Sequence, residues 1–258
     1  MAKIHPTAVV DPGAKIHDDA VVGPLSVVDG EVELGADTEI GPHVYVTGKT
    51  RIGARTRVYP FSVLGGAPQM LGFDGRTTEL VIGEGNTIRE HASIHVGTPK
   101  GGGRTKIGDN NLIMNNFHIA HDCQIGNHCV LAGYSGMGGH VILEDFVVIG
   151  GMTGIHQFVR IGCYAFTAGN SMVSKDVPPY AKVAGDRARF VGVNHINLER
   201  LGFDRERIAL IKHAFHVLFQ SKLRFAEACD RVESECGGSA DVLHLLEFLR
   251  SSERGFIR

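Results

Sequence analysis

The sequence has little net charge, few cysteines and no long apolar segment. Its 258 residues carry a formal net charge of −2. Attraction to a phosphate backbone needs clustered positive charge, so we expect no nucleic-acid partner. The five cysteines are odd in number and form no Cys-x-x-Cys pair. Neither a disulfide framework nor a structural zinc site is therefore indicated.

No apolar run approaches the roughly 20 residues of a membrane-spanning helix. Residues 1–12 also lack the charged segment followed by an apolar stretch that marks a signal peptide. We therefore expect a cytoplasmic protein without a membrane span. The chain is 43% hydrophobic and contains 34 glycines, which suits a soluble protein with one long domain and room for a smaller one.

An aliphatic residue recurs at every sixth position along most of the chain. These positions are Val10, Ile16, Val22, Val28, Leu34, Ile40, Val46, Ile52, Val58, Leu64, Ile82, Ile88, Ile94, Ile107, Ile113, Ile119, Ile125, Leu131, Met137, Leu143, Ile149, Ile155 and Ile161, with Thr167 and Val173 closing the run. Neither a helix nor an ordinary strand has this period. A hexapeptide solenoid does, because each hexad forms a short strand and a turn, with the aliphatic side chain inward and glycine relieving crowding at the corner. The sequence predicts an all-β solenoid in which three hexads make one triangular coil.

Two interruptions of the repeat, residues 65–76 and 97–104, are predicted to loop out from the solenoid wall. Loops held on a rigid scaffold commonly carry binding or catalytic groups. The period stops near Pro178 and Pro179. Because consecutive prolines cannot continue a hydrogen-bonded ladder, we expect the solenoid to end there.

After Asn194 the pattern becomes helical. Asp204 is predicted to cap one helix and Ser239 another, with a middle helix over residues 225–232. Such short amphipathic helices are unstable alone, so we expect them to pack on each other and on the solenoid. We therefore divide the chain into a hexapeptide-repeat domain, residues 1–190, and a C-terminal helical domain, residues 191–258.

Histidines gather where the repeat places one edge of the prism. Ile94, Ile119, Met137 and Ile155 take the same place in four successive coils. Adjacent coils should lie ~4.8 Å apart, like paired strands, so the histidines beside these positions should form a column: His95, His118, His121, His140 and His156. A column of imidazoles indicates acid-base chemistry or a metal site.

Within this column, His121 is followed directly by Asp122. A neighbouring carboxylate can orient an imidazole and stabilise its protonated form, which is a general-base arrangement. Gly138 and Gly139 precede His140, and their unobstructed N–H groups are suited to donate to a developing oxyanion.

With these segments the chain resembles the bacterial UDP-N-acetylglucosamine acyltransferases, which start lipid A synthesis. The likeness covers nearly the whole chain, and its most specific parts are the His-x-x-His-Asp segment ending at Asp122 and the His-Gln-Phe segment beginning at His156. Hexapeptides alone would be unspecific, because many acetyltransferases have them. The resemblance implies a homotrimer of left-handed parallel β-helices with active sites between subunits.

The resemblance also implies a reaction: a 3-hydroxyacyl chain moves from acyl carrier protein to position 3 of a UDP-sugar, without a cofactor. His121 matches the general base, Asp122 the residue that polarises it, and Gly139 the oxyanion donor. Gly169 matches a position where glycine keeps the acyl channel deep, and Asn194 and Arg200 match residues near the nucleotide. The residues expected to line the sugar and acyl contacts are His95, His118, His140, His156 and Gln157.

The first interruption departs from the family pattern. Where relatives have Asp-Leu-Lys-Tyr, with a lysine and an aspartate that contact the sugar, this chain has Met70, Leu71, Gly72 and Phe73. Some relatives that lack the lysine favour a UDP-sugar with an amine at position 3. The acceptor is therefore either UDP-N-acetylglucosamine or its 3-amino analogue, with Asp74 or Arg76 as alternative replacements for the lost contacts.

Two other functions remain open from the residues alone. Hexapeptide solenoids of the γ-carbonic anhydrase type hold zinc between subunits with three histidines. Because His121 has an acidic partner and nothing marks three of the histidines over the others, we expect no metal. A purely structural solenoid would need no histidine column. The sequence does not fix the preferred acyl chain length.

Overall fold

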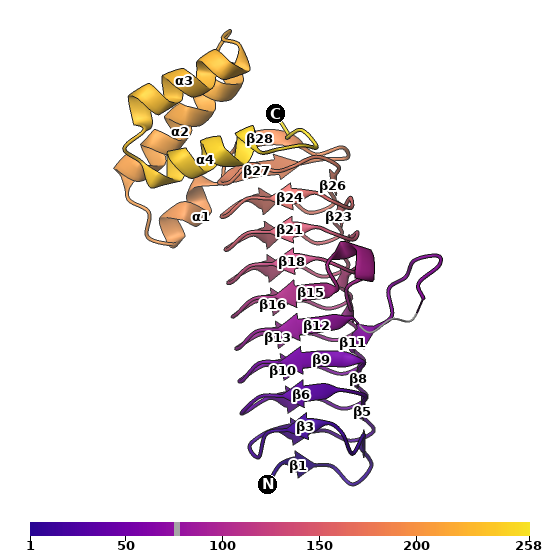
Figure 1. The fold of residues 1–258 in the computed structure, drawn as a ribbon. Coiled ribbons are helices and arrows are strands. Elements are labelled where there is room, and N and C mark those ends of the chain that lie inside the picture. Colours follow the sequence, from indigo (N-terminus) through magenta and orange to yellow (C-terminus); the bar gives the residue numbers. More distant parts are fainter. Residues whose placement is uncertain (75–77) are drawn as a thin grey trace.

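The structure is a computed structural model that describes residues 1–74 and 78–258. The chain forms a long prism of stacked coils with helices at its C-terminal end (Figure 1). The coils pair in parallel along three sheets. The protein is thus a left-handed parallel β-helix followed by helices, which confirms the predicted fold class.

Each face of the prism is one sheet, whose strands follow in this order. Sheet 1 contains β1 (Lys3–Ile4), β4 (Val21–Val22), β7 (Glu39–Ile40), β10 (Arg57–Val58), β13 (Thr87–Ile88), β16 (Leu112–Ile113), β19 (Val130–Leu131), β22 (Val148–Ile149), β25 (Phe166–Thr167), β27 (Ala181–Ala184) and β28 (Arg189–Val193). Sheet 2 contains β2 (Val9–Val10), β5 (Val27–Asp29), β8 (Tyr45–Thr47), β11 (Val63–Gly66), β14 (Ser93–His95), β17 (His118–Ile119), β20 (Gly136–Met137), β23 (Gly154–Ile155) and β26 (Met172–Val173). Sheet 3 contains β3 (Lys15–Ile16), β6 (Val32–Leu34), β9 (Lys49–Ile52), β12 (Glu79–Ile82), β15 (Arg104–Ile107), β18 (Gln124–Ile125), β21 (Ile142–Leu143) and β24 (Arg160–Ile161).

The repeated aliphatic side chains fill the centre of the prism. Val28, Ile94 and Ile119 are fully buried, as are most of the other repeat positions. Glycine at the corners has a steric reason. A Cβ placed on Gly53 would lie 2.5 Å from the carbonyl carbon of Gly83 in the next coil, so no larger residue fits without a backbone shift.

Many corners of the coils hold a non-glycine residue in the left-handed conformation. Asp122 has φ of 60° and His140 has φ of 61°, and each is the third residue after an inward aliphatic one. Side chains at equivalent corners lie above one another. The rings of His128, Phe146 and Tyr164 stack with successive centroid distances of 4.8 Å. A corner position thus places a side chain in a column along an edge of the prism.

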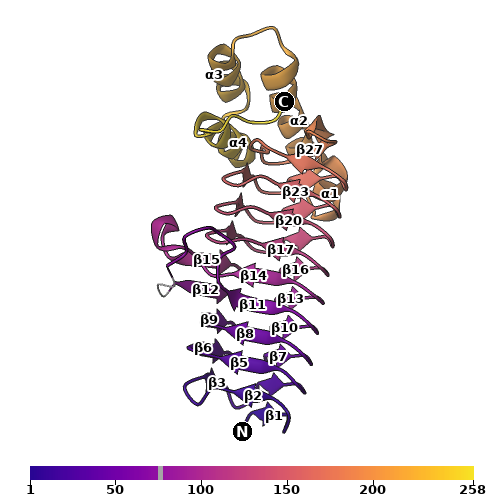
Figure 2. The same cartoon turned by 90° about the vertical axis from the view of Figure 1, so that its right-hand side faces the viewer.

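Both predicted excursions leave the solenoid wall. The loop between β11 and β12 projects away from the prism (Figure 1) on the side that faces the viewer in Figure 2, and its Leu71 is fully exposed. The excursion between β14 and β15 contains the short 3₁₀ helix η1 (Pro99–Gly101). This second excursion turns back and contacts the next coil, as described below.

The prediction that the solenoid ends at the two prolines is wrong for sheet 1. Strand β27 pairs in parallel with β25, and β28 then pairs antiparallel with β27. Pro178 and Pro179 lie in the connection between Val177, which bridges Ile161, and Ala181. The two prolines therefore lie between β26 and β27 and belong to neither strand. The domain division at residue 190 stays a prediction, and in the structure that position lies within β28.

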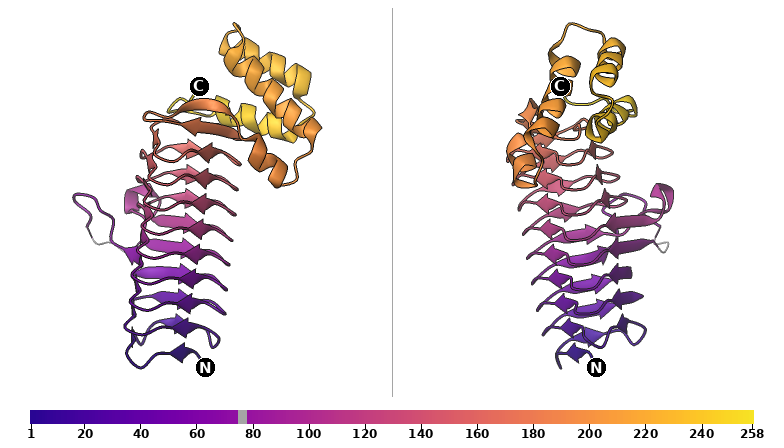
Figure 3. Two further views of the ribbon diagram at one scale, coloured as in Figure 1. Left: turned by 180° about the vertical axis from the view of Figure 1, so that it is seen from behind. Right: turned by 90° about the vertical axis from the view of Figure 1, so that its left-hand side faces the viewer.

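Four α-helices follow among the described residues: α1 (His195–Arg200), α2 (Arg205–Gln220), α3 (Phe225–Cys236) and α4 (Ala240–Arg250). They cover the end of the prism and extend beyond one side of it (Figure 3). The Asp204 side chain caps α2 by accepting from the N–H of Arg207, as predicted, whereas Ser239 precedes α4 without a side-chain cap bond. No helix in the described part of the chain has the length and apolarity needed to cross a bilayer.

Polar pairs join the helices to the solenoid. The Tyr180 hydroxyl donates to Oδ1 of Asp241 in α4 at 2.9 Å, and Nη2 of Arg207 in α2 donates to the same oxygen at 2.8 Å. Nε2 of His244 in α4 lies 2.7 Å from Oε2 of Glu144 on the prism. These contacts fix α4 against the coils that carry the histidine column.

Candidate active site

The histidine column forms as the repeat predicts. Ile94 pairs with Ile119, Ile119 with Met137, and Met137 with Ile155 across sheet 2. Two pairs of the flanking imidazoles therefore meet on successive coils. The rings of His95 and His118 lie 5.0 Å apart between centroids, and those of His121 and His140 lie 5.2 Å apart, both edge to face.

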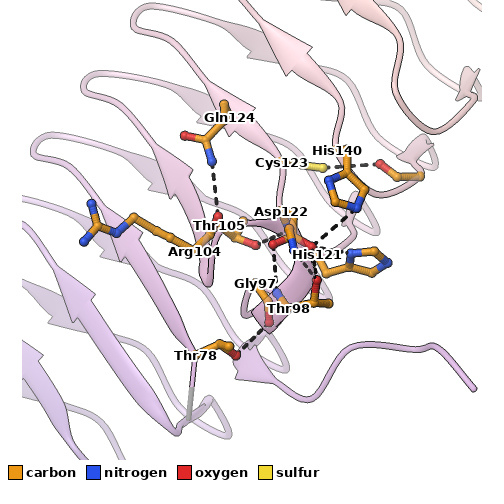
Figure 4. Close-up of polar contacts among 12 residues, drawn as sticks. Thr78, Gly97, Thr98, Arg104, Thr105, His121, Asp122, Cys123, Gln124 and His140 are labelled. Atoms are coloured by element: carbon orange, nitrogen blue, oxygen red, sulfur yellow. Dashed lines mark hydrogen bonds and ion pairs between the residues drawn. The ribbon is translucent and has the colours of Figure 1, made fainter. Parts of the chain in front are cut away.

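Asp122 is the most tightly held polar residue of this edge (Figure 4). Its carboxylate is buried, and Oδ2 lies 2.8 Å from Nδ1 of His121. Thr98 donates to it twice, from its N–H to Oδ1 at 2.8 Å and from its hydroxyl to Oδ2 at 2.7 Å. The N–H of Asp122 donates to the Thr105 hydroxyl at 2.8 Å. This network fixes the carboxylate against one ring nitrogen of His121.

Two glycines leave room for this arrangement. A Cβ on Gly101 of η1 would lie 2.2 Å from the carboxylate carbon of Asp122. A Cβ on Gly139 would lie 2.5 Å from Cε1 and 2.8 Å from Nε2 of His121. The backbone of Gly139 thus lies directly beside the ring that the sequence predicts to be the base.

Burial keeps the neighbouring imidazoles in their neutral form. Desolvation lowers the pKa of His95 to about 4, with smaller contributions from the charges of His118 and His121. Nδ1 of His95 is buried and has no hydrogen-bond partner among the described residues. Burial also lowers the pKa of His118, whose Nδ1 lies 2.7 Å from the Ser93 hydroxyl.

His140 lies between an aromatic ring and the carboxylate. Its ring stacks on Phe158 with a centroid distance of 4.5 Å, and its Nε2 lies 3.6 Å from Oδ2 of Asp122. Burial lowers the pKa of His140 more than the charge of Asp122 raises it, and His121 lowers it further. At neutral pH His140 is therefore neutral.

His156 and Gln157 lie one coil further along the column. His156 lines a cavity of about 410 Å³, together with His118, Met137, Met172 and Ser174. Its walls include glycines at 136, 138 and 154. Gln157 lies against Gly138, since a Cβ there would come within 2.8 Å of the Gln157 nitrogen. The cavity thus lies beside the histidine column, and most of the residues that line it are apolar.

Three of the predicted site residues lie elsewhere in the single chain. Asn194 and Arg200 line a second cavity of about 400 Å³ with Phe166 and Lys182 of sheet 1. Gly169 lies in the turn between β25 and β26, against Gly151. His121 lies in the turn between sheets 2 and 3. One chain therefore does not bring these three residues to the histidine column.

Two groups of side chains in the described residues are close enough to hold a metal ion. They are His121, Asp122 and His140, and Glu144, Cys163 and His244, each with ligand atoms within 4.8 Å of one another. In both groups the carboxylate already accepts a short bond from a histidine, at 2.8 Å and 2.7 Å. These hydrogen bonds account for the proximity of the side chains in each group.

Sequence reasoning missed Thr98 and Thr105, the two residues that hold Asp122. Thr98 precedes a proline and caps η1 by accepting from the N–H of Gly101. A threonine before a proline is a common helix start, and that was the available signal. Its second contact, to a residue 24 positions further along the chain, follows only from how the excursion folds back.

Two protein-family models match the chain. The family described as bacterial transferase hexapeptide matches residues 104–139, and the one described as UDP N-acetylglucosamine O-acyltransferase, domain 2, matches residues 176–257. The fold is thus that of a hexapeptide-repeat transferase.

Similar proteins identify the family to which the chain belongs within this class of transferases. The acyl-[acyl-carrier-protein]--UDP-N-acetylglucosamine O-acyltransferases of Myxococcus xanthus and Halorhodospira halophila are 47% and 48% identical over 258 residues, the full length of both chains in each case. The UDP-N-acetylglucosamine O-acyltransferase from Moraxella catarrhalis superposes with a TM-score of 0.96 at 38% identity, and LpxA from Acinetobacter baumannii with 0.96 at 40%, each covering 99% of both chains. The chain belongs to the UDP-N-acetylglucosamine O-acyltransferase family.

Proposed function

We propose that the protein transfers a 3-hydroxyacyl group from acyl carrier protein to position 3 of UDP-N-acetylglucosamine or its 3-amino analogue, a step of lipid A biosynthesis in the cytoplasm. The observation that carries this proposal is the short contact between Nδ1 of His121 and the buried carboxylate of Asp122. Thr98 holds that carboxylate in place with two hydrogen bonds, and the Thr105 hydroxyl accepts from the backbone N–H of Asp122. An imidazole oriented in this way is suited to act as a general base.

The proton path follows from the chemistry of the ring. A carboxylate only accepts, so Nδ1 of His121 carries the hydrogen and Nε2 keeps its lone pair. Nε2 takes the proton of the acceptor's nucleophile as that atom bonds to the thioester carbonyl carbon. The tetrahedral intermediate then collapses, its carbon–sulfur bond breaks, and the imidazolium returns the proton to the departing thiol. Asp122 stabilises the imidazolium throughout.

Gly139 is suited to stabilise the negative oxygen of that intermediate. Its N–H donates no backbone hydrogen bond to any other described residue. It also lies beside the His121 ring, with no side chain between them. A preorganised donor next to the base acts where charge develops in the transition state.

The acceptor depends on the loop between β11 and β12. Met70 and Leu71 are exposed there, and Gly72 has φ of 75°, where an added Cβ would meet nothing within 4 Å. Neither of the family's two polar contacts is present at these positions. An amine is a better nucleophile than a hydroxyl and needs fewer contacts, so the 3-amino analogue would tolerate the loss of these two contacts. Of the two alternative contacts, Asp74 lies in the same loop, and Arg76 lies outside the described residues.

The acceptor is tested by measuring kcat/KM for both UDP-sugars side by side. The amino-sugar proposal expects the analogue to be preferred, with activity rising with pH through the pKa of its own amine. A tenfold preference for the hydroxyl sugar, about 1.4 kcal/mol in transition-state binding, would contradict it. Gly72→Lys should then improve use of the hydroxyl sugar. Because φ at this position favours glycine, Gly72→Ala is the matched control for backbone strain.

A homotrimer with sites between subunits accounts for the separation within one chain. Gly169 lies on the edge between sheets 1 and 2, whereas His121 lies on the edge between sheets 2 and 3. When equivalent prisms pack side by side, edges of different subunits meet. The trimer is tested by sedimentation or light scattering, in which a monomer at assay concentration would contradict it.

The zinc enzyme is the alternative from another class. His121, Asp122 and His140 are close enough to share an ion, and a zinc-bound hydroxide would hydrate carbon dioxide. Treatment with a chelator separates the two functions. We expect acyl transfer to be unchanged after the chelator has been dialysed away, whereas a zinc enzyme would lose its activity and regain it with added zinc.

A further inference from the structure

The C-terminal tail, residues 251–258, contacts the solenoid beside His156. Nη2 of Arg254 lies 2.8 Å from Nδ1 of His156. Nε of the same guanidinium donates to the carbonyl oxygen of Ser174 at 2.8 Å. His156 and Ser174 both line the apolar cavity described above. Arg254 thus contacts two residues of the cavity wall.

The backbone around Arg254 is anchored, so its position is defined. The N–H of Asp176 donates to the carbonyl oxygen of Gly255 at 3.0 Å, and the N–H of Ile257 donates to the carbonyl oxygen of Asp176 at 2.8 Å. The Ser252 hydroxyl donates to Oδ2 of Asp176 at 2.8 Å. The tail forms a short bridge to the end of the prism, next to the label C in Figure 1.

Nδ1 of His156 has two polar neighbours with opposite requirements. The guanidinium of Arg254 has only donors, so it needs a lone pair on Nδ1. The carbonyl oxygen of Gln157, 3.1 Å from the same nitrogen, is an acceptor and needs a hydrogen there. One nitrogen cannot satisfy both. The shorter contact is the one to Arg254.

We propose that Arg254 is a positioning residue that selects the tautomer of His156 with its hydrogen on Nε2. Nε2 makes no hydrogen bond with another residue in the described ranges. His156 therefore meets a ligand in the cavity as a hydrogen-bond donor to an oxygen. Without Arg254, the carbonyl of Gln157 captures a hydrogen on Nδ1, and Nε2 becomes an acceptor. The inference rests on the proposed function only in that an oxygen of the acyl-transfer substrates is the ligand.

The tautomer is read directly from nitrogen NMR of protein with ¹⁵N-labelled histidine, without substrate. His156→Asn assigns the two signals. We expect Nδ1 of the unaltered protein to resonate as a bare ring nitrogen and Nε2 as a protonated one, and Arg254→Leu to exchange the two. Arg250→Leu is the matched control, because its guanidinium pairs with Glu233 within the helices. A hydrogen on Nδ1 of the unaltered protein would overturn the proposal, whether or not any variant folds.

Kinetics supply a second readout that a merely structural role would not produce. Arg254→Leu should lower kcat/KM for acyl transfer about tenfold, the size expected for one substrate hydrogen bond. Arg254→Lys should restore part of the loss, since an ammonium also donates. On a His156→Ala background, Arg254→Leu should have no further effect. An equal loss with and without His156 would overturn the proposal.

The two proposals fail separately. If the tautomer depends on Arg254 but no acyl transfer occurs with either UDP-sugar, the proposed function is wrong and the positioning role stands. If acyl transfer occurs and the tautomer is the same in Arg254→Leu, the positioning role is wrong and the proposed function stands.

Discussion

At the residue scale, the chemistry depends on how a buried carboxylate is satisfied. Asp122 is 4% exposed, and its oxygens accept from Thr98 and face His121. A buried charge persists only when it is paired and hydrogen-bonded. His121, Asp122 and Thr98 thus orient one another. We expect the removal of each side chain to have its own effect on kcat.

Asp122→Asn should lower kcat less than loss of the imidazole does. The amide oxygen can still accept from Nδ1, but the negative charge that stabilises the imidazolium is gone. We expect a loss of at least about tenfold in kcat with little change in KM, because the interaction strengthens only in the transition state. Steady-state kinetics check this. Activity equal to that of the unaltered enzyme would mean that Asp122 has only a structural role.

The buried His95 should make the protein less stable in acid. Its pKa is lowered to about 4 in the folded state, against about 6.5 when unfolded. Above pH 6.5 it is neutral in both states and has no effect. As the pH falls from 6.5 towards 4, only the unfolded chain takes up the proton, so stability falls, by roughly 3 kcal/mol at most.

His95→Gln removes this titration and is the variant to compare. Urea unfolding at pH 7.5 and 4.5, at equal protein concentration, should show a smaller loss of stability in acid for the variant than for the unaltered protein. Equal losses in the two proteins would contradict the low pKa of His95.

At the element scale, the excursion with η1 completes the site. Gly101→Ala would place a methyl group 2.2 Å from the Asp122 carboxylate carbon. Either η1 or the carboxylate must move, so we expect kcat to fall by about tenfold or more. Gly238→Ala is the matched control, because a Cβ there meets nothing within 4 Å. Activity of Gly101→Ala equal to that of the control would show that the carboxylate need not be held by η1.

The excursion that contains η1 also shows which contacts the sequence does not predict. The period of six predicts the coils, and the register then predicts the histidine column, since every coil repeats the same geometry. The contact of Thr98 with Asp122 lies outside this regularity, because an excursion can fold back or project. The loop that contains Leu71 projects instead. The parallel pairing of β27 was missed because the prolines occupy a connection and not a strand.

At the scale of the whole molecule, the proposed trimer predicts that one site uses residues of two chains. Gly169→Met should shift the donor preference towards shorter acyl chains, since each buried methylene is worth about 0.8 kcal/mol. A mixture of Gly169→Met and His121→Ala chains, assembled together, should then regain long-chain transfer. Sites that combine His121 of the first variant with Gly169 of the second are intact.

Each variant assembled alone is the control for this mixture, and neither should transfer the long chain efficiently. Assays with donors of several chain lengths check both parts of the prediction. No recovery in mixed trimers would contradict a site that draws His121 and Gly169 from different subunits, and an unchanged chain-length preference would mean that the acyl chain does not reach Gly169.

The central claim is that His121 is the general base of acyl transfer, and one comparison tests it most directly. The comparison measures the rate of acyl transfer from acyl carrier protein to the preferred UDP-sugar, first for the unaltered protein and then for His121→Ala. We predict a loss of ~10²–10⁴-fold in kcat, with the trimer and its melting temperature retained, because the imidazole lies at an edge of the prism and outside the aliphatic core. A variant that folds and keeps a kcat near that of the unaltered protein would contradict the account.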